Sequence, residues 1–234
     1  MKKIILLLLI LISLSCKKEE PIQKGTPNAS AQYSVCNSAL SACVNSTGDY
    51  CLFGFKWGAD SVFVETGSNA KGPKSPGGLV TFSFQERNGS VNTHRQVGLQ
   101  SRSFDELMSC AKTEIRNALD TWAASADINF EELPENSDSD IRFFVADIVQ
   151  TGVGYPNYLE APCDAIQGTM VIRTNNSIGN CKHFYLFALH ELGHILGLGH
   201  VETRSVMNPH FWDFNFNDLQ AGDRIGITQI YGEK

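Results

Sequence analysis

The chain has 234 residues, enough for one sizeable domain with an appended segment but hardly for two full domains. Hydrophobic residues make up 42% of the sequence and charged residues 19%, a balance that allows a packed core. The net charge of -6 and the lack of a dense basic run argue against nucleic acid as a partner.

Residues 1–15 are predicted to form a secretory signal peptide. Two lysines precede an unbroken apolar run at 4–12, which is too short to span a bilayer as a mature helix. The serine-rich end of this segment resembles a bacterial lipoprotein signal, in which Cys16 would receive lipid, although Ser13 stands where leucine is usual. The alternative is an ordinary secreted protein cleaved near Ser15. We therefore expect an exported protein, either anchored by lipid to the bacterial envelope or cell surface or released.

Residues 16–49 are expected to form a lipid-anchor tether and a cysteine-bearing segment, because the chain after Cys16 is polar and contains proline. If Cys16 carries lipid, six cysteines remain, and an even number in an exported chain suggests three disulfides. The preferred local pair is Cys163 with Cys181, which would brace the chain before the histidine-rich stretch. The alternative is that some of the six are free buried thiols. The six are Cys36, Cys43, Cys51, Cys110, Cys163 and Cys181.

Residues 50–234 are expected to form one folded domain of mixed α and β structure. The segment 103–125 opens with Ser103 and Glu106, a capping box, and its apolar residues recur at helical spacing, so we predict one long amphipathic helix packed on a sheet. Alternating β-rich patterns and the remaining periodicity predict strands at 79–84, 128–133, 141–147 and 168–174, a turn at 134–140, and helices that begin near 182 and after 217.

Three of the six histidines lie in the stretch HELGHILGLGH. Residues four apart share one face of a helix, so His190 and His194 can reach the same metal ion. Glu191 points about 100° further round the helix, beside the metal. A straight helix would carry His200 away from that face, but glycine readily adopts positive φ and commonly ends helices. A helix that ends at Gly197 would therefore deliver His200 to the ion.

This pattern predicts a catalytic zinc site with three protein ligands and one open position. A structural zinc site would leave Glu191 without a role. A second alternative makes Glu202 the third ligand, but the two glycines at positions 197 and 199 favour His200. With Glu191 as general base, the site would hydrolyse a peptide bond by means of a zinc-activated water.

The motif HExxHxxGxxH is the signature of the metzincin zinc peptidases, and HELGHILGLGH resembles that of the matrixin branch. In metzincins a methionine in a tight turn lies beneath the zinc, and Met207 in SVMNP matches it. Pro209 is also matrixin-like. The resemblance covers roughly 52–232. It implies an α+β, metzincin-like catalytic domain, with a twisted and mostly parallel sheet, an antiparallel edge strand, two long helices and a C-terminal helix.

The resemblance implies a zinc-dependent endopeptidase in residues 50–234, with one catalytic Zn²⁺ bound by His190, His194 and His200. The expected partners are protein or peptide substrates, with no nucleic acid, a membrane contact only through the lipid anchor, and a monomeric state. The competing function is a non-catalytic zinc-containing surface binding protein on a peptidase fold. Degenerate members of that kind usually lose the glutamate or a ligand, and this chain keeps both.

Several features around this motif stay open in the sequence. The strand GTMVIRT (168–174) is a candidate edge strand to which a substrate peptide could add. The aromatic residues of 208–214 either wall a substrate pocket or belong to the core. No matrixin segment for structural Ca²⁺ or a second Zn²⁺ is recognisable in 147–181, and no cysteine-switch motif is found. The remaining histidines of interest are expected to be surface or packing residues: His94, His183 and His210.

Overall fold

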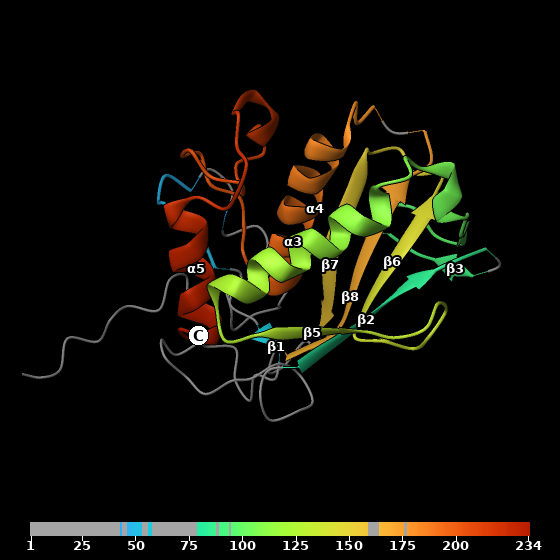
Figure 1. The fold of residues 1–234 in the computed structure, drawn as a ribbon, viewed down its shortest axis with the longest axis horizontal. Helices are drawn as coiled ribbons and strands as arrows, with labels where there is room; N and C mark the ends of the chain where they lie inside the picture. The colour runs from blue at the N-terminus through green and yellow to red at the C-terminus, as the bar shows by residue number, and fades with distance from the viewer. Residues whose placement is uncertain are drawn as a thin grey trace, which may run out of the picture.

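The computed structural model describes residues 43, 46–52, 56–57, 79–87, 89–93, 95–158, 164–175 and 177–234, and these form an α+β fold (Figure 1). The strands are β1 (Lys56–Trp57), β2 (Leu79–Gln85), β3 (Ser90–Val91), β4 (Leu99–Gln100), β5 (Asn129–Glu132), β6 (Ile141–Ala146), β7 (Gly152–Tyr158) and β8 (Asp164–Arg173). The helices are α3 (Ala111–Ser125), α4 (Cys181–Leu196) and α5 (Ala221–Tyr231), with single 3₁₀ turns at Phe104–Glu106 and Phe211–Asp213.

The main sheet has six strands, and all of its pairings but one are parallel. Strands β5, β2, β6 and β8 lie next to one another in that order, and β1 pairs with the start of β8. Strand β7 pairs antiparallel with β8. The expected mostly parallel sheet with an antiparallel edge strand is therefore confirmed, as are the two long helices and the C-terminal helix.

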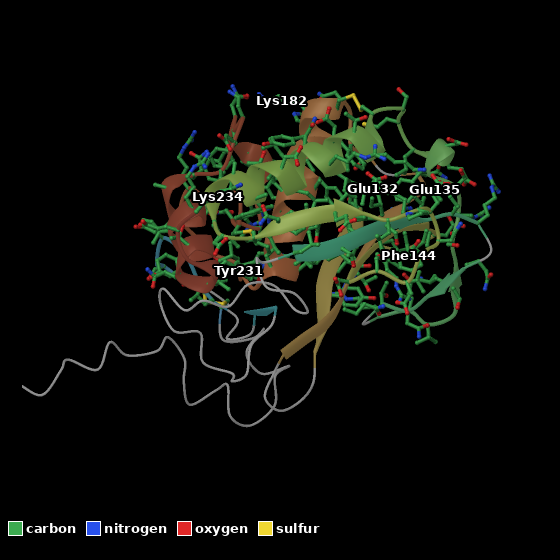
Figure 2. The ribbon with its side chains drawn as sticks, turned by 60° about the horizontal axis from the view of Figure 1, so that its bottom comes forward. Glu132, Glu135, Phe144, Lys182, Tyr231 and Lys234 are labelled. Atoms are coloured by element: carbon green, nitrogen blue, oxygen red, sulfur yellow. A yellow bond between two sulfur atoms is a disulfide. The ribbon has the colours of Figure 1, made fainter. Side chains whose placement is uncertain are left out.

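The two faces of the sheet are covered by different elements, because successive side chains of a strand point to opposite faces. On one face, Phe82, Phe143 and Ile172 join the main core with α3 and α4. On the other face, Phe144 and Val171 pack in a smaller cluster with residues of β3 and β4. In Figure 2, Phe144 lies on the side of the sheet away from α3. The core that supports the histidine-rich helix is thus the larger of the two.

The edge strand was assigned wrongly from the sequence. GTMVIRT belongs to β8, which is an interior strand between β6 and β7. The edge strand is β7, in a segment that reads as a Gly- and Pro-rich loop. Its glycines are needed for packing: a Cβ added at Gly152 would lie 2.2 Å from the Phe187 ring, and one at Gly154 would lie 2.3 Å from the Glu191 carbonyl oxygen. Strand β7 therefore lies directly against α4.

The start of the first long helix was also assigned wrongly. Ser103 caps only the 3₁₀ turn, with its Oγ accepting from the Asp105 N–H at 3.1 Å. Leu107 then adopts an extended conformation that ends the turn, and α3 begins only at Ala111. The Glu106 carboxylate bonds to the Arg87 guanidinium at 2.8 Å instead of completing a capping box.

Two disulfides join cysteines among the described residues, Cys43–Cys51 and Cys110–Cys181. The expected Cys163–Cys181 pair is therefore wrong. Cys110 is the N-cap of α3 and Cys181 is the first residue of α4, so this disulfide joins the starts of the two long helices. Figure 2 shows it as a yellow bond beside Lys182.

The predicted signal peptide, the lipid on Cys16, and residues Cys36, Cys163 and His94 all lie outside the described residues. The division at residues 15 and 49 stays a prediction. In the part of the chain that the structure describes, no helix has the length and apolar character required to cross a membrane. The two disulfides are consistent with export, because such bonds persist mainly in oxidising compartments.

The two disulfides should contribute unequally to stability. They close sequence separations of 71 residues (Cys110–Cys181) and 8 residues (Cys43–Cys51). A disulfide that closes a longer loop restricts the unfolded chain more. Replacing both cysteines of a pair by alanine should therefore lower the free energy of unfolding by about 4 kcal/mol for Cys110–Cys181 and by about 2.5 kcal/mol for Cys43–Cys51. Urea unfolding of the two double variants measures this. The reverse ranking would contradict the argument.

Candidate metal centre

Helix α4 carries two of the three histidines and ends where the third requires it to end. The Asn180 side chain caps its start by accepting from the His183 N–H at 2.9 Å. Its C-cap, Gly197, has φ 111°, a left-handed conformation that favours glycine. The Leu198 N–H then donates to the Gly193 carbonyl at 2.8 Å, which completes the helix stop. The predicted end of the helix at Gly197 is confirmed, and the chain turns back towards α4 with His200.

The Nε2 atoms of the three histidines converge on one point. They lie 3.2 Å apart between His190 and His194, 3.1 Å between His194 and His200, and 3.2 Å between His200 and His190. Two of the rings present their other nitrogen to a backbone carbonyl: His190 Nδ1 to Val206 at 2.7 Å and His194 Nδ1 to Leu198 at 2.9 Å. A carbonyl only accepts, so these Nδ1 atoms carry the proton and the Nε2 atoms are bare acceptors.

This donor set fits a zinc ion. Zn–N distances of about 2.0–2.1 Å and tetrahedral angles place ligand nitrogens about 3.3 Å apart, close to the separations observed. A carbonyl on Nδ1 is the usual partner that fixes the tautomer of a metal-bound histidine. The three side chains are therefore arranged so that they could hold one metal ion.

The site favours uncharged imidazoles. Burial lowers the pKa of His194 to about 3 and that of His190 well below its usual value, and the neighbouring rings add to both effects. Burial also lowers the pKa of His200. Neutral imidazole is the form that binds a metal. Desolvation has the opposite effect on the carboxyl of Glu191, whose pKa rises to about 7.

Glu191 of α4 packs against the edge strand β7. The Gly154 N–H of β7 donates to its Oε2 at 2.5 Å. The backbone of β7 can approach so closely only because residue 154 has no side chain. A carboxyl with a pKa near 7 can both accept and release a proton at neutral pH, which is what a general base that later acts as an acid requires.

The turn around Met207 supports the histidines from below. Met207 is buried, and a Cβ added at Gly193 would lie 2.3 Å from its Sδ. The first glycine of HELGHILGLGH is therefore needed for packing and not for a bend. Val206, next to it, supplies the carbonyl that orients His190. Met207 thus packs against α4 at Gly193, and its place beneath a bound metal stays a prediction.

Asp223 of α5 organises this turn, and sequence reasoning missed it. Its buried carboxylate accepts from the Val206 N–H at 3.0 Å, from the Gln220 N–H at 2.7 Å and from the Ser205 hydroxyl. Val206 thus bonds Asp223 through its N–H and His190 through its carbonyl. An acidic residue in the first turn of a helix reads as an ordinary cap, so the sequence holds no separate signal for this second role.

The aromatic residues after Met207 divide between core and surface. Phe211 is buried and stacks on the His190 ring with centroids 4.5 Å apart. Trp212 is 42% exposed, stacks on Phe187 and lies near His183. Of the two predicted roles, packing holds for Phe211, whereas Trp212 is open to solvent beside the site. His183 and His210 are exposed, as expected for surface residues.

Glu202 does not join the histidine cluster: it is exposed, and the ligand atoms that converge are those of His190, His194 and His200. The other group of potential ligands within the described residues is Cys110, Glu114 and Cys181. Its two sulfurs form the disulfide at the helix starts, so they are not thiolates available to a metal. The described residues therefore present one histidine cluster with the chemistry of a zinc site.

Comparison with known proteins points to the same region. Residues 169–232 match the family model of the matrixins. The chain is 29% identical over 142 residues to matrix metalloproteinase-16 of human and of rat, covering 50% of this chain and 23% of each relative. It is 28% identical over 144 residues to human matrix metalloproteinase-26, covering 56% of this chain and 54% of that protein.

This region of the chain is matrixin-like. The matched residues include all of α4, the three histidines, the methionine turn and α5. The similarities support a metalloendopeptidase, and the family match implies zinc. The chain spans about a quarter of the length of matrix metalloproteinase-16 and about half of that of matrix metalloproteinase-26.

The shifted pKa values predict how the stability of the metal-free matrixin-like site varies with pH. Below the ordinary histidine pKa of 6.5, the unfolded chain protonates rings that the folded site keeps neutral. Stability therefore falls as the pH drops, by about 1.4 kcal/mol per pH unit for each proton gained on unfolding. Glu191 opposes this between pH 7 and 4.5, because there the folded state holds its proton. Urea unfolding at several pH values measures the slope.

The variant Glu191→Gln separates these contributions. Since glutamine does not titrate, the metal-free variant should lose stability more steeply than the native protein as the pH falls from 7 to 4.5. Parallel curves for the two proteins would show that the carboxyl titrates at its ordinary pKa in the folded state.

Replacing Asp223 should weaken both the fold and the metal site. Asp223→Asn removes a buried charge that accepts several hydrogen bonds and turns an amide donor towards the donors that surround it. We expect a loss of about 3 kcal/mol in the free energy of unfolding and about tenfold in zinc affinity. Denaturant unfolding and chelator competition measure the two.

The matched control is Asp218→Asn, which removes a carboxylate that pairs with Arg224 at the surface. Such exposed pairs contribute about 1 kcal/mol or less. Equal effects of the two substitutions on zinc affinity would refute the role given to Asp223.

Proposed function

We propose that this protein is a zinc-dependent endopeptidase in which His190, His194 and His200 bind one catalytic ion and Glu191 is the general base. The observation that carries the proposal is the convergence of three Nε2 atoms at 3.1–3.2 Å beside a carboxyl group whose pKa is raised to about 7. A structural metal site would have no use for that carboxyl.

When bound, zinc would polarise the scissile carbonyl and make a water molecule more acidic. The protein's own residues would do the rest. The Glu191 carboxylate would take a proton from the attacking water and later pass it to the leaving amine. The Gly154 N–H would hold the carboxyl in place through Oε2, which leaves Oε1 for the proton.

A substrate would bind along the outer edge of β7 in this proposal. The Thr151 carbonyl accepts from the Arg173 N–H of β8, so by alternation the backbone groups of Gly152 and Gly154 face away from the sheet. Because the Gly154 N–H donates to Glu191, a substrate would pair with the backbone groups of Gly152 and with the Gly154 carbonyl. An extended peptide could add there as a further strand, held by its backbone with little demand on sequence. Pro156 has no N–H to offer and would limit the length of this pairing.

The exposed face of Trp212 would contact a substrate side chain. It stacks on Phe187 of α4 and packs against Phe211, which in turn stacks on His190. An apolar surface so close to the ligands favours an apolar side chain next to the cleaved bond. Export and a lipid on Cys16 belong to the same proposal, since a tether would place the site outside the cell.

Removing the general base should abolish cleavage and leave the metal in place. For Glu191→Gln we expect kcat/KM on a mixed peptide library to fall by about 10²–10⁴-fold, with zinc content unchanged because no ligand is touched. His200→Ala should lose both activity and zinc. Mass spectrometry of digests and metal analysis of the purified proteins give the two readouts.

Two controls complete the experiment. A chelator should abolish native activity, and added zinc should restore it. Cleavage that survives in Glu191→Gln would refute the proposed base. If the zinc-loaded native protein cleaves no peptide in a broad library, the non-catalytic surface binding function is favoured instead.

A further inference from the structure

We propose that the disulfide-closed segment 43–51, here called the cystine loop, positions the third metal ligand, His200. The proposal rests on the metal site proposed above and concerns how one ligand is held. In Figure 1 the described part of this segment, coloured blue, lies beside α5. The sequence prediction assigned residues 43–49 of this loop to the region before the catalytic domain, and nothing in the histidine motif refers to the loop.

The residues immediately before His200 are bound by the last residue of the cystine loop, Cys51. The Gly199 N–H donates to the Cys51 carbonyl at 2.8 Å. The next residue, Leu52, forms an antiparallel bridge with Leu198. The two residues that bring the chain out of α4 towards His200 are therefore paired with the cystine loop and its immediate continuation.

On the other side of His200, two further hydrogen bonds reach the middle of the cystine loop. The Glu202 N–H donates to the Ser46 carbonyl at 2.8 Å. The Thr203 hydroxyl donates to the Gly48 carbonyl at 3.1 Å. The ligand is thus held from both directions along the chain by one short segment that is remote in sequence.

The same segment also acts on a second ligand. The Leu198 carbonyl accepts from His194 Nδ1 at 2.9 Å and so fixes the tautomer of that ring. Because Leu198 is bridged to Leu52, a displacement of the cystine loop would move this carbonyl as well. Its influence therefore extends from His200 to His194.

Helix α5 packs closely against the cystine loop. A Cβ added at Gly222 would lie 2.0 Å from the Asp49 carbonyl oxygen, and one at Gly226 would lie 3.0 Å from the Tyr50 Cβ. Two glycines four residues apart share one face of the helix, so the backbone of the loop approaches α5 closely there. An alanine at Gly222 would push the loop away without touching the disulfide.

The disulfide is what keeps this segment in one conformation. Residues 46–50 have no helix or strand structure, and ordering an irregular segment costs conformational entropy. Both sulfurs are buried, and the Ser46 N–H donates to the Cys43 carbonyl at 3.3 Å. Closing the loop covalently reduces the freedom that the hydrogen bonds around His200 would otherwise have to overcome.

The test compares zinc release from full-length, zinc-loaded variants. In Cys43→Ala/Cys51→Ala and in Gly222→Ala, transfer of Zn²⁺ to a chromophoric chelator should be about tenfold faster than in the native protein. Hydrogen exchange at the Gly199 and Glu202 amides should speed up in the same variants. Near-UV circular dichroism establishes that each protein is folded.

Matched controls separate positioning from general stability. Cys110→Ala/Cys181→Ala removes the disulfide with the longer span, so it should lower the melting temperature more but release zinc at the native rate. Ile225→Ala changes an exposed residue of α5 and should also behave as native. If the first cysteine variant does not fold, the comparison of Gly222→Ala with Ile225→Ala decides.

The outcomes distinguish this proposal from the enzymatic one. Zinc release at the native rate in folded Gly222→Ala, or equally fast release in the Cys110→Ala/Cys181→Ala control, would overturn the positioning role even if the native protein is an active peptidase. Faster release confined to the cystine-loop variants would support it, even if the native protein cleaves no peptide.

Discussion

Three imidazole Nε2 atoms face one another at 3.1–3.2 Å, those of His190 and His194 carry no proton, and the surrounding structure depends on this constraint. Such lone pairs repel, and a cation between them is what makes the arrangement favourable. Two rings keep their proton on the far side only because the carbonyls of Val206 and Leu198 accept it. Those carbonyls lie in irregular chain, so each needs a support of its own. Asp223 supplies it for Val206, and Leu52 supplies it for Leu198. The geometry of the site therefore depends on residues other than the three histidines and Glu191.

Local spacing was enough to predict the centre of this arrangement. The distance of four residues between His190 and His194, and the glycine at 197, are properties of one helix and its end, and the structure places both as expected. The strand β2 was predictable for the same reason, since the alternation of Val80, Phe82 and Phe84 reflects burial on one face. The mostly parallel arrangement of the sheet followed from the resemblance to a known fold.

The parts that were missed depend on partners distant in the sequence. The sequence of strand β7 resembles a loop because it contains glycines, which have low strand propensity. These glycines are required by the close contact with α4. Ser103 does cap a 3₁₀ turn, but Leu107 is extended, and the long helix begins only after Cys110, which is held by a disulfide. Nothing near Cys181 indicates that its partner lies 71 residues away. In each case tertiary packing overrode a local pattern.

The hydrogen bond between Asp223 and Val206 has a consequence for the order in which the site can form. The chain is synthesised from its N-terminus, so the three histidines emerge before Asp223, which follows His200 by 23 residues. Until α5 has folded against the methionine turn, the Val206 carbonyl is not held, and the His190 ring has no fixed tautomer. A chain that stops short of Asp223 therefore carries the ligands of the site without its geometry. A metal centre of this design is complete only when the segment that follows its ligands has folded.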